Sequence, residues 1–188
     1  MPGAVVGFYG KLPARGDFVC VGLPRDFTEP WDAWLQAVLA GSRKLMGEAW
    51  LPSFLAAPVW RFALPPSMCG KQAALGLMLP SVDKIGRYFP LTFAALSPQL
   101  PAPDEAWLAT CEAAGGAALE RDTPPQDIAG MLSMPDLHAA SSGLVDAEWW
   151  SDGSERVKAV RMVLRTLPDS ATFAAMLGGA MTATERMS

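Results

Sequence analysis

Short apolar runs separated by turn-forming residues dominate the first half of the chain. Residues 4–9 are apolar and rich in β-branched and aromatic side chains, and residues 59–64 are apolar around a central arginine. Residues 73–79 are continuously apolar, which is typical of a strand covered on both faces, and residues 91–96 form another apolar run. The runs lie close together, so we expect one sheet in which neighbouring strands are mostly antiparallel.

A long helix is predicted from about residue 30 to residue 46, because apolar residues recur there at helical spacing. Thr28 is a candidate N-cap for this helix. One face carries large apolar side chains, and we expect that face to pack on the sheet. The residues of this face are Trp31, Trp34 and Val38.

The second half of the chain predicts shorter helices and late strands. Asp104, Thr123 and Asp169 can each cap a helix, and apolar residues follow them at helical spacing. Residues 157–164 are rich in Val, Met and Leu and predict a late strand. Strands early and late with helices between them indicate an α/β fold, with a mixed, partly antiparallel sheet covered by helices on both faces.

Length and charge limit the class of protein. The chain has 188 residues, the size of one domain, and its 51% hydrophobic residues are enough for a full core. The formal net charge is -4 without any basic run, which argues against a nucleic-acid partner. We find neither the pattern of a signal peptide nor an apolar run that crosses a bilayer, so we expect a cytoplasmic protein without membrane insertion.

The residue types needed for metal or covalent chemistry are sparse. Cys20, Cys69 and Cys111 are widely separated, so we expect three free thiols in a reducing compartment. His138 is the single histidine, and it comes without the ligand spacing of a zinc site or the nucleophile elbow of a serine hydrolase. We therefore expect no metal site, no cofactor and no catalytic residue.

Two charged, glycine-containing loops follow apolar strands, at residues 10–17 and 81–88. Gly10-Lys11 does not form a P-loop, because it lacks the earlier glycine of that motif and the Ser or Thr that must follow the lysine, and Gly70-Lys71 fails in the same way. In α/β sheets, sites usually lie at the edge to which strands deliver such loops. We therefore expect the two loops to converge at one edge.

Two interpretations of the loop charges stay open. In the first, the charges pair with one another and hold the strands in place, and Arg15-Gly16-Asp17 is a turn with a local ion pair. In the second, they form a docking surface for a protein partner, and a rigid paired cluster satisfies both interpretations. The candidate partner-binding residues of the two loops are Lys11, Arg15, Asp17, Asp83 and Arg87.

Trp149 and Trp150 are adjacent in residues 147–150, which we predict to be a short strand or the entry to a turn. Adjacent side chains on a strand point to opposite faces. We therefore expect one of the two to be exposed or to lie at an interface, where tryptophan is enriched among binding hot spots. Both join the candidate partner-binding residues.

Four motif-rich segments follow one another in the first half of the chain: GFYGKLPARGDF at residues 7–18, EPWDAWLQ at 29–36, APVWRFAL at 57–64 and PSVDKIGRYFPLT at 80–92. In this order they resemble the TagF family, also called ImpM, of accessory proteins of bacterial type VI secretion. The second half resembles the family only loosely.

The resemblance implies a single TagF-like domain over residues 1–188, folded as a three-layer α-β-α sandwich. It also implies a regulator that represses assembly of the type VI apparatus after translation and associates with the forkhead-associated scaffold protein of that system. Some family members carry a fused phosphatase domain of the PP2C type, and this chain resembles the stand-alone form. Such a regulator binds proteins and has no small-molecule substrate.

A different class of function stays open, namely a small hydrolase or a phosphate-ester-binding enzyme. Its site would lie in loops 10–17 and 81–88, with Asp17 or Asp83 as the general base. The basic residues that would hold the anion are Lys11, Arg15, Lys84 and Arg87.

Overall fold

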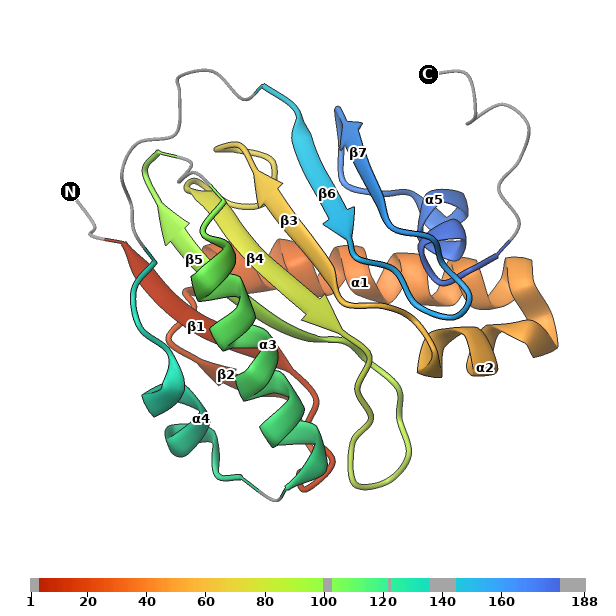
Figure 1. Ribbon diagram of the computed structural model, residues 1–188, viewed down its shortest axis with the longest axis horizontal. Coiled ribbons are helices and arrows are strands. Elements are labelled where there is room, and N and C mark those ends of the chain that lie inside the picture. Colours follow the sequence, from red (N-terminus) through yellow and green to blue (C-terminus); the bar gives the residue numbers. More distant parts are fainter. Residues whose placement is uncertain (1–3, 100–102, 122, 136–144, 180–188) are drawn as a thin grey trace.

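A seven-stranded sheet forms the centre of the molecule (Figure 1). The structure is a computed structural model that describes residues 4–99, 103–121, 123–135 and 145–179. The strand order within these ranges is β2-β1-β5-β4-β3-β6-β7, and the four strands predicted in the first half are confirmed as parts of this sheet. The strands are β1 (Val5–Gly10), β2 (Val19–Val21), β3 (Trp60–Leu64), β4 (Ala73–Leu79), β5 (Leu91–Ser97), β6 (Ala147–Ser151) and β7 (Val160–Leu164).

Every neighbouring strand pair among the described residues is antiparallel. The sheet was predicted to contain parallel as well as antiparallel pairs, and the prediction of parallel pairs is wrong. The physical reason is that four of the pairs, β1–β2, β3–β4, β4–β5 and β6–β7, are joined directly without a helix. Parallel neighbours need a longer crossover connection, which is usually helical.

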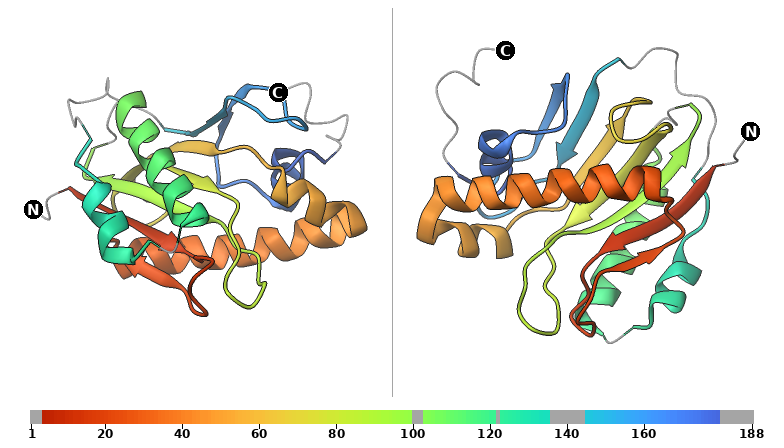
Figure 2. Two further views of the ribbon diagram at one scale, coloured as in Figure 1. Left: turned by 60° about the horizontal axis from the view of Figure 1, so that its bottom comes forward. Right: turned by 180° about the vertical axis from the view of Figure 1, so that it is seen from behind.

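Helices cover both faces of the sheet, so the predicted three-layer α-β-α sandwich is confirmed (Figure 1 and Figure 2). One face is covered by α1, α2 and α5 together with the 3₁₀ turn η1, and the other by α3 and α4. The helical segments are α1 (Arg25–Met46), η1 (Gly47–Ala49), α2 (Trp50–Leu55), α3 (Glu105–Glu120), α4 (Pro125–Met131) and α5 (Ser170–Met176).

The long helix α1 packs on the sheet through its tryptophan face, as predicted. Trp31 is fully buried, and its indole Nε1 donates a hydrogen bond of 2.9 Å to Thr92 Oγ1 on β5. Val38 is buried and Trp34 is partly buried against the same core. The helix begins more than one turn earlier than predicted, because N–H groups of its first turn donate to the Pro24 carbonyl.

The order of the strands decides which loops meet. β5 lies between β1 and β4 and is antiparallel to both. β1 and β4 therefore run in the same direction, and their carboxyl ends lie at the same edge of the sheet. The loops that follow these two strands are the charged loops at residues 10–17 and 81–88.

Cysteine reactivity tests the packing on both faces of the sheet, because Cys69 lies on the α1 side and Cys111 on the α3 side. Cys69 and Cys111 are buried, and burial raises the pKa of each thiol to about 12, whereas Cys20 is exposed. We expect a disulfide reagent such as DTNB, at about pH 8, to modify only Cys20 rapidly in the folded protein. Counting under denaturing, non-reducing conditions should find all three thiols. Rapid native modification of Cys69 or Cys111 would contradict the packing described.

Candidate functional site

The two charged loops meet through one buried carboxylate. Asp83, in the loop after β4, accepts a hydrogen bond from Lys11 in the loop after β1, and the distance from Nζ to Oδ2 is 2.8 Å. The Asp83 side chain is 0% exposed and the Lys11 side chain 6% exposed. The convergence of the two loops, predicted from the strand pattern, is confirmed.

Four donors surround the two oxygens of Asp83. Besides Lys11, Oδ2 accepts a hydrogen bond from Arg87 Nε at 2.6 Å, and Oδ1 accepts from the backbone N–H groups of Ile85 at 3.1 Å and Arg87 at 2.8 Å. Burial by itself would raise the pKa of this carboxyl, but the hydrogen bonds from Lys11, Arg87 and Ile85 outweigh burial and hold the pKa well below its usual range. Asp83 is therefore ionised at neutral pH.

Further contacts join the two loops around this carboxylate. Ser81 Oγ donates a hydrogen bond of 2.6 Å to the Lys11 carbonyl, and the Lys84 N–H donates one of 2.9 Å to the Arg15 carbonyl. The Lys11 ammonium also lies 4.9 Å from the ring centre of Phe18. The loops therefore form one connected unit.

Two glycines are required where the loops bend. Gly10 has a φ of 145°, and a Cβ at this position would lie 2.3 Å from the Pro90 carbonyl oxygen, too close for any side chain. Gly86 has a φ of 85° near the tip of the second loop, a conformation that glycine adopts without strain. Gly10 therefore allows the end of β1 to lie against the segment that enters β5, and Gly86 allows the second loop to turn.

The outer side of the loop pair is exposed and charged. Arg15, Asp17 and Lys84 are exposed, and their side chains form no ion pair with any residue in the described ranges. The predicted ion pair between Arg15 and Asp17 is therefore absent, in keeping with the small free energy that an exposed pair contributes. Arg87 is both paired and accessible. It binds Asp83 and donates a hydrogen bond to a carbonyl of the first loop, and its side chain is 53% exposed.

The structural interpretation of the charges holds for only some of the residues, and the docking interpretation stays a prediction for the others. Lys11 and Asp83 are buried and paired, which makes them structural. Arg15 and Asp17 are available to a partner, and Arg87 is in part structural and in part accessible. Asp83 is also a poor general base, because its oxygens already accept hydrogen bonds and its pKa is low.

Trp149 and Trp150 do not belong to this surface. They point to opposite faces as predicted: Trp149 packs beside Trp31 on the α1 side, and Trp150 lies in the core on the α3 side. Their exposed fractions are 0% and 5%, so the prediction that one of them is exposed is wrong. The reason is that Arg161 of the neighbouring strand covers Trp150, with its guanidinium carbon 4.8 Å from the ring centre.

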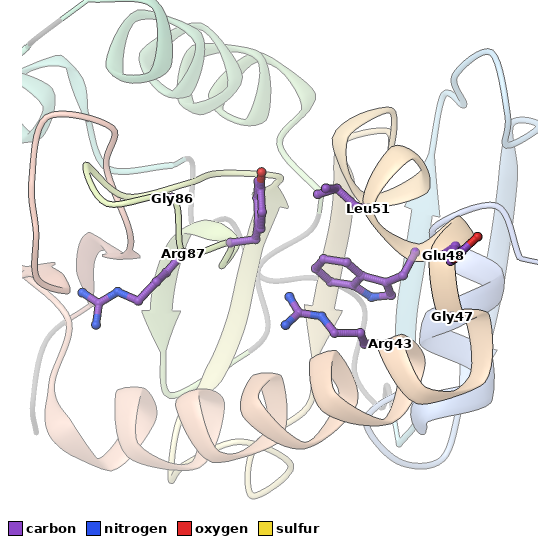
Figure 3. A pocket seen from close by; sticks show the side chains of 8 residues that line it. Arg43, Gly47, Glu48, Leu51, Gly86 and Arg87 are labelled. Atoms are coloured by element: carbon purple, nitrogen blue, oxygen red, sulfur yellow. The ribbon is translucent and has the colours of Figure 1, made fainter.

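A groove that the sequence pattern did not predict lies beside the second loop (Figure 3). Its volume is about 620 Å³. Arg43, Trp50 and Leu51 line one side, and residues 86–88 of the second loop line the other. Sequence spacing contains no signal for this groove, because its two sides are about forty residues apart and meet only in the folded chain.

The described ranges contain neither a cluster of metal ligands nor a membrane-spanning helix. No group of three or more His, Cys, Asp and Glu side chains in those ranges is placed to hold a metal ion. Among the described helices, none combines the length and the apolar character needed to cross a membrane. His138, interpreted as a loop residue, lies outside the described ranges.

Comparison with known proteins identifies the family. A family model of the TagF N-terminal domain, described as type VI secretion system-associated, matches residues 7–134. The chain belongs to the TagF family. The chain is also similar to a solved structure, PA0076 from Pseudomonas aeruginosa PAO1. The two sequences are 33% identical, and the TM-score is 0.82 over 95% of this chain and 96% of that chain. A search of curated proteins found no match.

The TagF match starts within β1, at residue 7, and includes both charged loops and every element from β2 to α4. The strands β6 and β7 and the helix α5 lie beyond the family model, whereas the similarity to PA0076 covers 95% of the chain. The resemblance drawn from the four sequence motifs is thereby confirmed, and the type VI secretion association follows from it.

Removing the carboxylates of Asp83 and Asp17 should affect stability unequally. Asp83→Asn leaves the buried Lys11 ammonium without its counter-charge, so we expect the Tm at neutral pH to fall by about 10 °C. Asp17→Asn is the matched control on the exposed side and should change the Tm by less than about 2 °C. Thermal unfolding followed by circular dichroism measures both values. Equal Tm values for the two variants would contradict a structural role for Asp83.

The low pKa of Asp83 also predicts how this stability depends on pH. The pKa of this carboxyl is lower in the folded state than in the unfolded state. Its ionised form therefore contributes its full stabilisation above the ordinary pKa of about 4, and this stabilisation is lost as the pH falls below that value. The Tm difference between wild type and Asp83→Asn should therefore be largest at neutral pH and shrink from about pH 4.5 to about pH 3. A constant difference over this range would mean that the charge of Asp83 does not stabilise the fold.

Proposed function

We propose that this TagF protein is a cytoplasmic regulator that represses assembly of the type VI secretion apparatus after translation. In this proposal it acts by binding the forkhead-associated scaffold protein of that system. Membership of the TagF family supports the link to type VI secretion. The observation that carries the binding role is the loop pair, in which the buried Lys11–Asp83 ion pair lies beneath the exposed side chains of Arg15, Asp17 and Arg87.

Such a surface suits recognition of a protein for two physical reasons. Its backbone is held in place by hydrogen bonds between the loops, so little conformational entropy is lost when a partner binds. Its exposed residues carry both signs of charge, which favours one partner and one orientation over others. We expect a few of these residues to contribute most of the affinity.

The loops are less suited to catalysis. Ser81, a potential nucleophile between them, is buried and its hydroxyl donates to the Lys11 carbonyl instead of facing a base. Asp83 is fully hydrogen-bonded. We therefore propose that the protein acts by binding rather than by turnover.

Affinity for the purified scaffold protein, measured by isothermal titration calorimetry, tests the proposal. Arg15→Ala and Asp17→Ala should each weaken binding by about fivefold or more while leaving the Tm nearly unchanged, because both side chains are exposed. Lys158→Ala is the matched control, since Lys158 is also exposed but lies beside β7 at the other end of the sheet. It should bind as tightly as wild type.

Secretion in a host with an active apparatus gives the second readout. Extra copies of the wild-type protein should suppress secretion, and the folded Arg15→Ala, Asp17→Ala double variant should suppress it less. Full suppression by that variant would place the contact surface elsewhere. Turnover of phosphate or acyl esters that is lost in Asp17→Ala would overturn the binding role in favour of an enzyme.

A further inference from the structure

In the groove beside the second loop, the guanidinium of Arg43 lies over an aromatic ring. Arg43 extends from the last turn of α1, and its guanidinium carbon lies 4.1 Å from the ring centre of Trp50. Trp50 is 2% exposed, and its Nε1 donates a hydrogen bond of 2.9 Å to Ser42 Oγ, so the ring is a rigid support. Arg43 itself is exposed and forms no ion pair with a carboxylate of the described residues.

This arrangement leaves Arg43 ready to bind an anion. A guanidinium that lies over an aromatic ring without a carboxylate partner has N–H donors left open, and those donors match the two oxygens of a carboxylate. Stacking also restricts the side chain before any ligand arrives. The acidic residue of the groove, Glu48, points away from the space between Arg43 and the second loop (Figure 3).

Apolar side chains lie on both sides of the groove. Leu51 and Tyr88 line the groove, and Leu51 is 38% exposed although it is a large aliphatic residue. Leu55 on α2 and Ile85 in the second loop are 59% and 69% exposed. Exposed apolar residues grouped beside a polar rim are typical of protein-binding surfaces.

The groove is continuous with the loop pair. Arg87 lines it and is directed toward the first loop, where its guanidinium donates to the Gly16 carbonyl (Figure 3). Two basic residues, Arg43 and Arg87, therefore line the groove, in a chain whose net charge is -4. A complementary segment must be acidic with apolar side chains.

We propose that the groove receives an acidic segment of the scaffold protein, with a carboxylate on Arg43 and an apolar side chain against Leu51 and Tyr88. This inference rests on the proposed function and adds the chemistry of the partner segment. It assigns recognition to residues of α1 and α2 that lie outside the two charged loops.

Paired variants test the groove by calorimetric titration with the purified scaffold protein. Arg43→Gln and Leu51→Ala should each weaken binding by about tenfold. Their matched controls are Lys44→Gln and Leu45→Ala, because these neighbours are exposed but do not line the groove. The controls should bind within about twofold of wild type. Thermal unfolding of all four variants identifies any loss of affinity that comes from loss of fold, and a folded Arg43→Gln with wild-type affinity overturns the inference.

A photo-reactive amino acid identifies the occupant directly. With p-benzoylphenylalanine in place of Leu51, irradiation of the complex should attach a scaffold peptide that contains Asp or Glu beside apolar residues. A basic peptide, or no cross-link at this position in a complex that forms, overturns the inference. If Arg15→Ala weakens binding but the groove variants do not, the proposed function stands and the groove inference fails. If the wild-type protein does not bind the scaffold, both fail.

Discussion

The buried carboxylate of Asp83 is the interaction on which the site depends. β5 separates β1 from β4, so no ladder of backbone hydrogen bonds joins the two strands that carry the charged loops. The loops are joined instead by Asp83, which binds Lys11 of one loop and Arg87 of its own. An isolated buried carboxylate would be strongly unfavourable, and the surrounding donors offset its desolvation only while both loops keep their positions. The charge therefore makes the geometry of one loop depend on that of the other.

Buried and exposed charges are separated within one short region. The paired charges are buried and hold the backbone, while the unpaired charges are carried on the outside by the same loops. Arg87 connects the two roles and also borders the groove formed with α1 and α2. In the proposed function, affinity for a partner can be tuned at Arg15 and Asp17 without loss of fold, because these exposed side chains take no part in the buried pairing.

The fold and the site differ in how far the sequence predicts them. The central strands and α1 could be predicted because their apolar periods depend on local neighbours. The pairing of the charges could not be predicted from the sequence, because Asp17 and Asp83 lie in similar loops. Only the folded path of the chain places Asp83 against Lys11. The environment of Trp150 was unpredictable for the same reason, since Arg161 on another strand covers it. The antiparallel sheet follows from direct connections, which the predicted strand spacing indicated only in part.

Amide hydrogen exchange at Lys84, measured by NMR in wild type and in Asp83→Asn, tests most directly whether Asp83 holds the loops together. The Lys84 N–H donates to the Arg15 carbonyl across the two loops. We expect this amide to be protected in wild type and to exchange about tenfold faster or more in the variant, while amides of β5 keep their protection. Unchanged exchange at Lys84 in the folded variant would contradict a tie between the loops through Asp83.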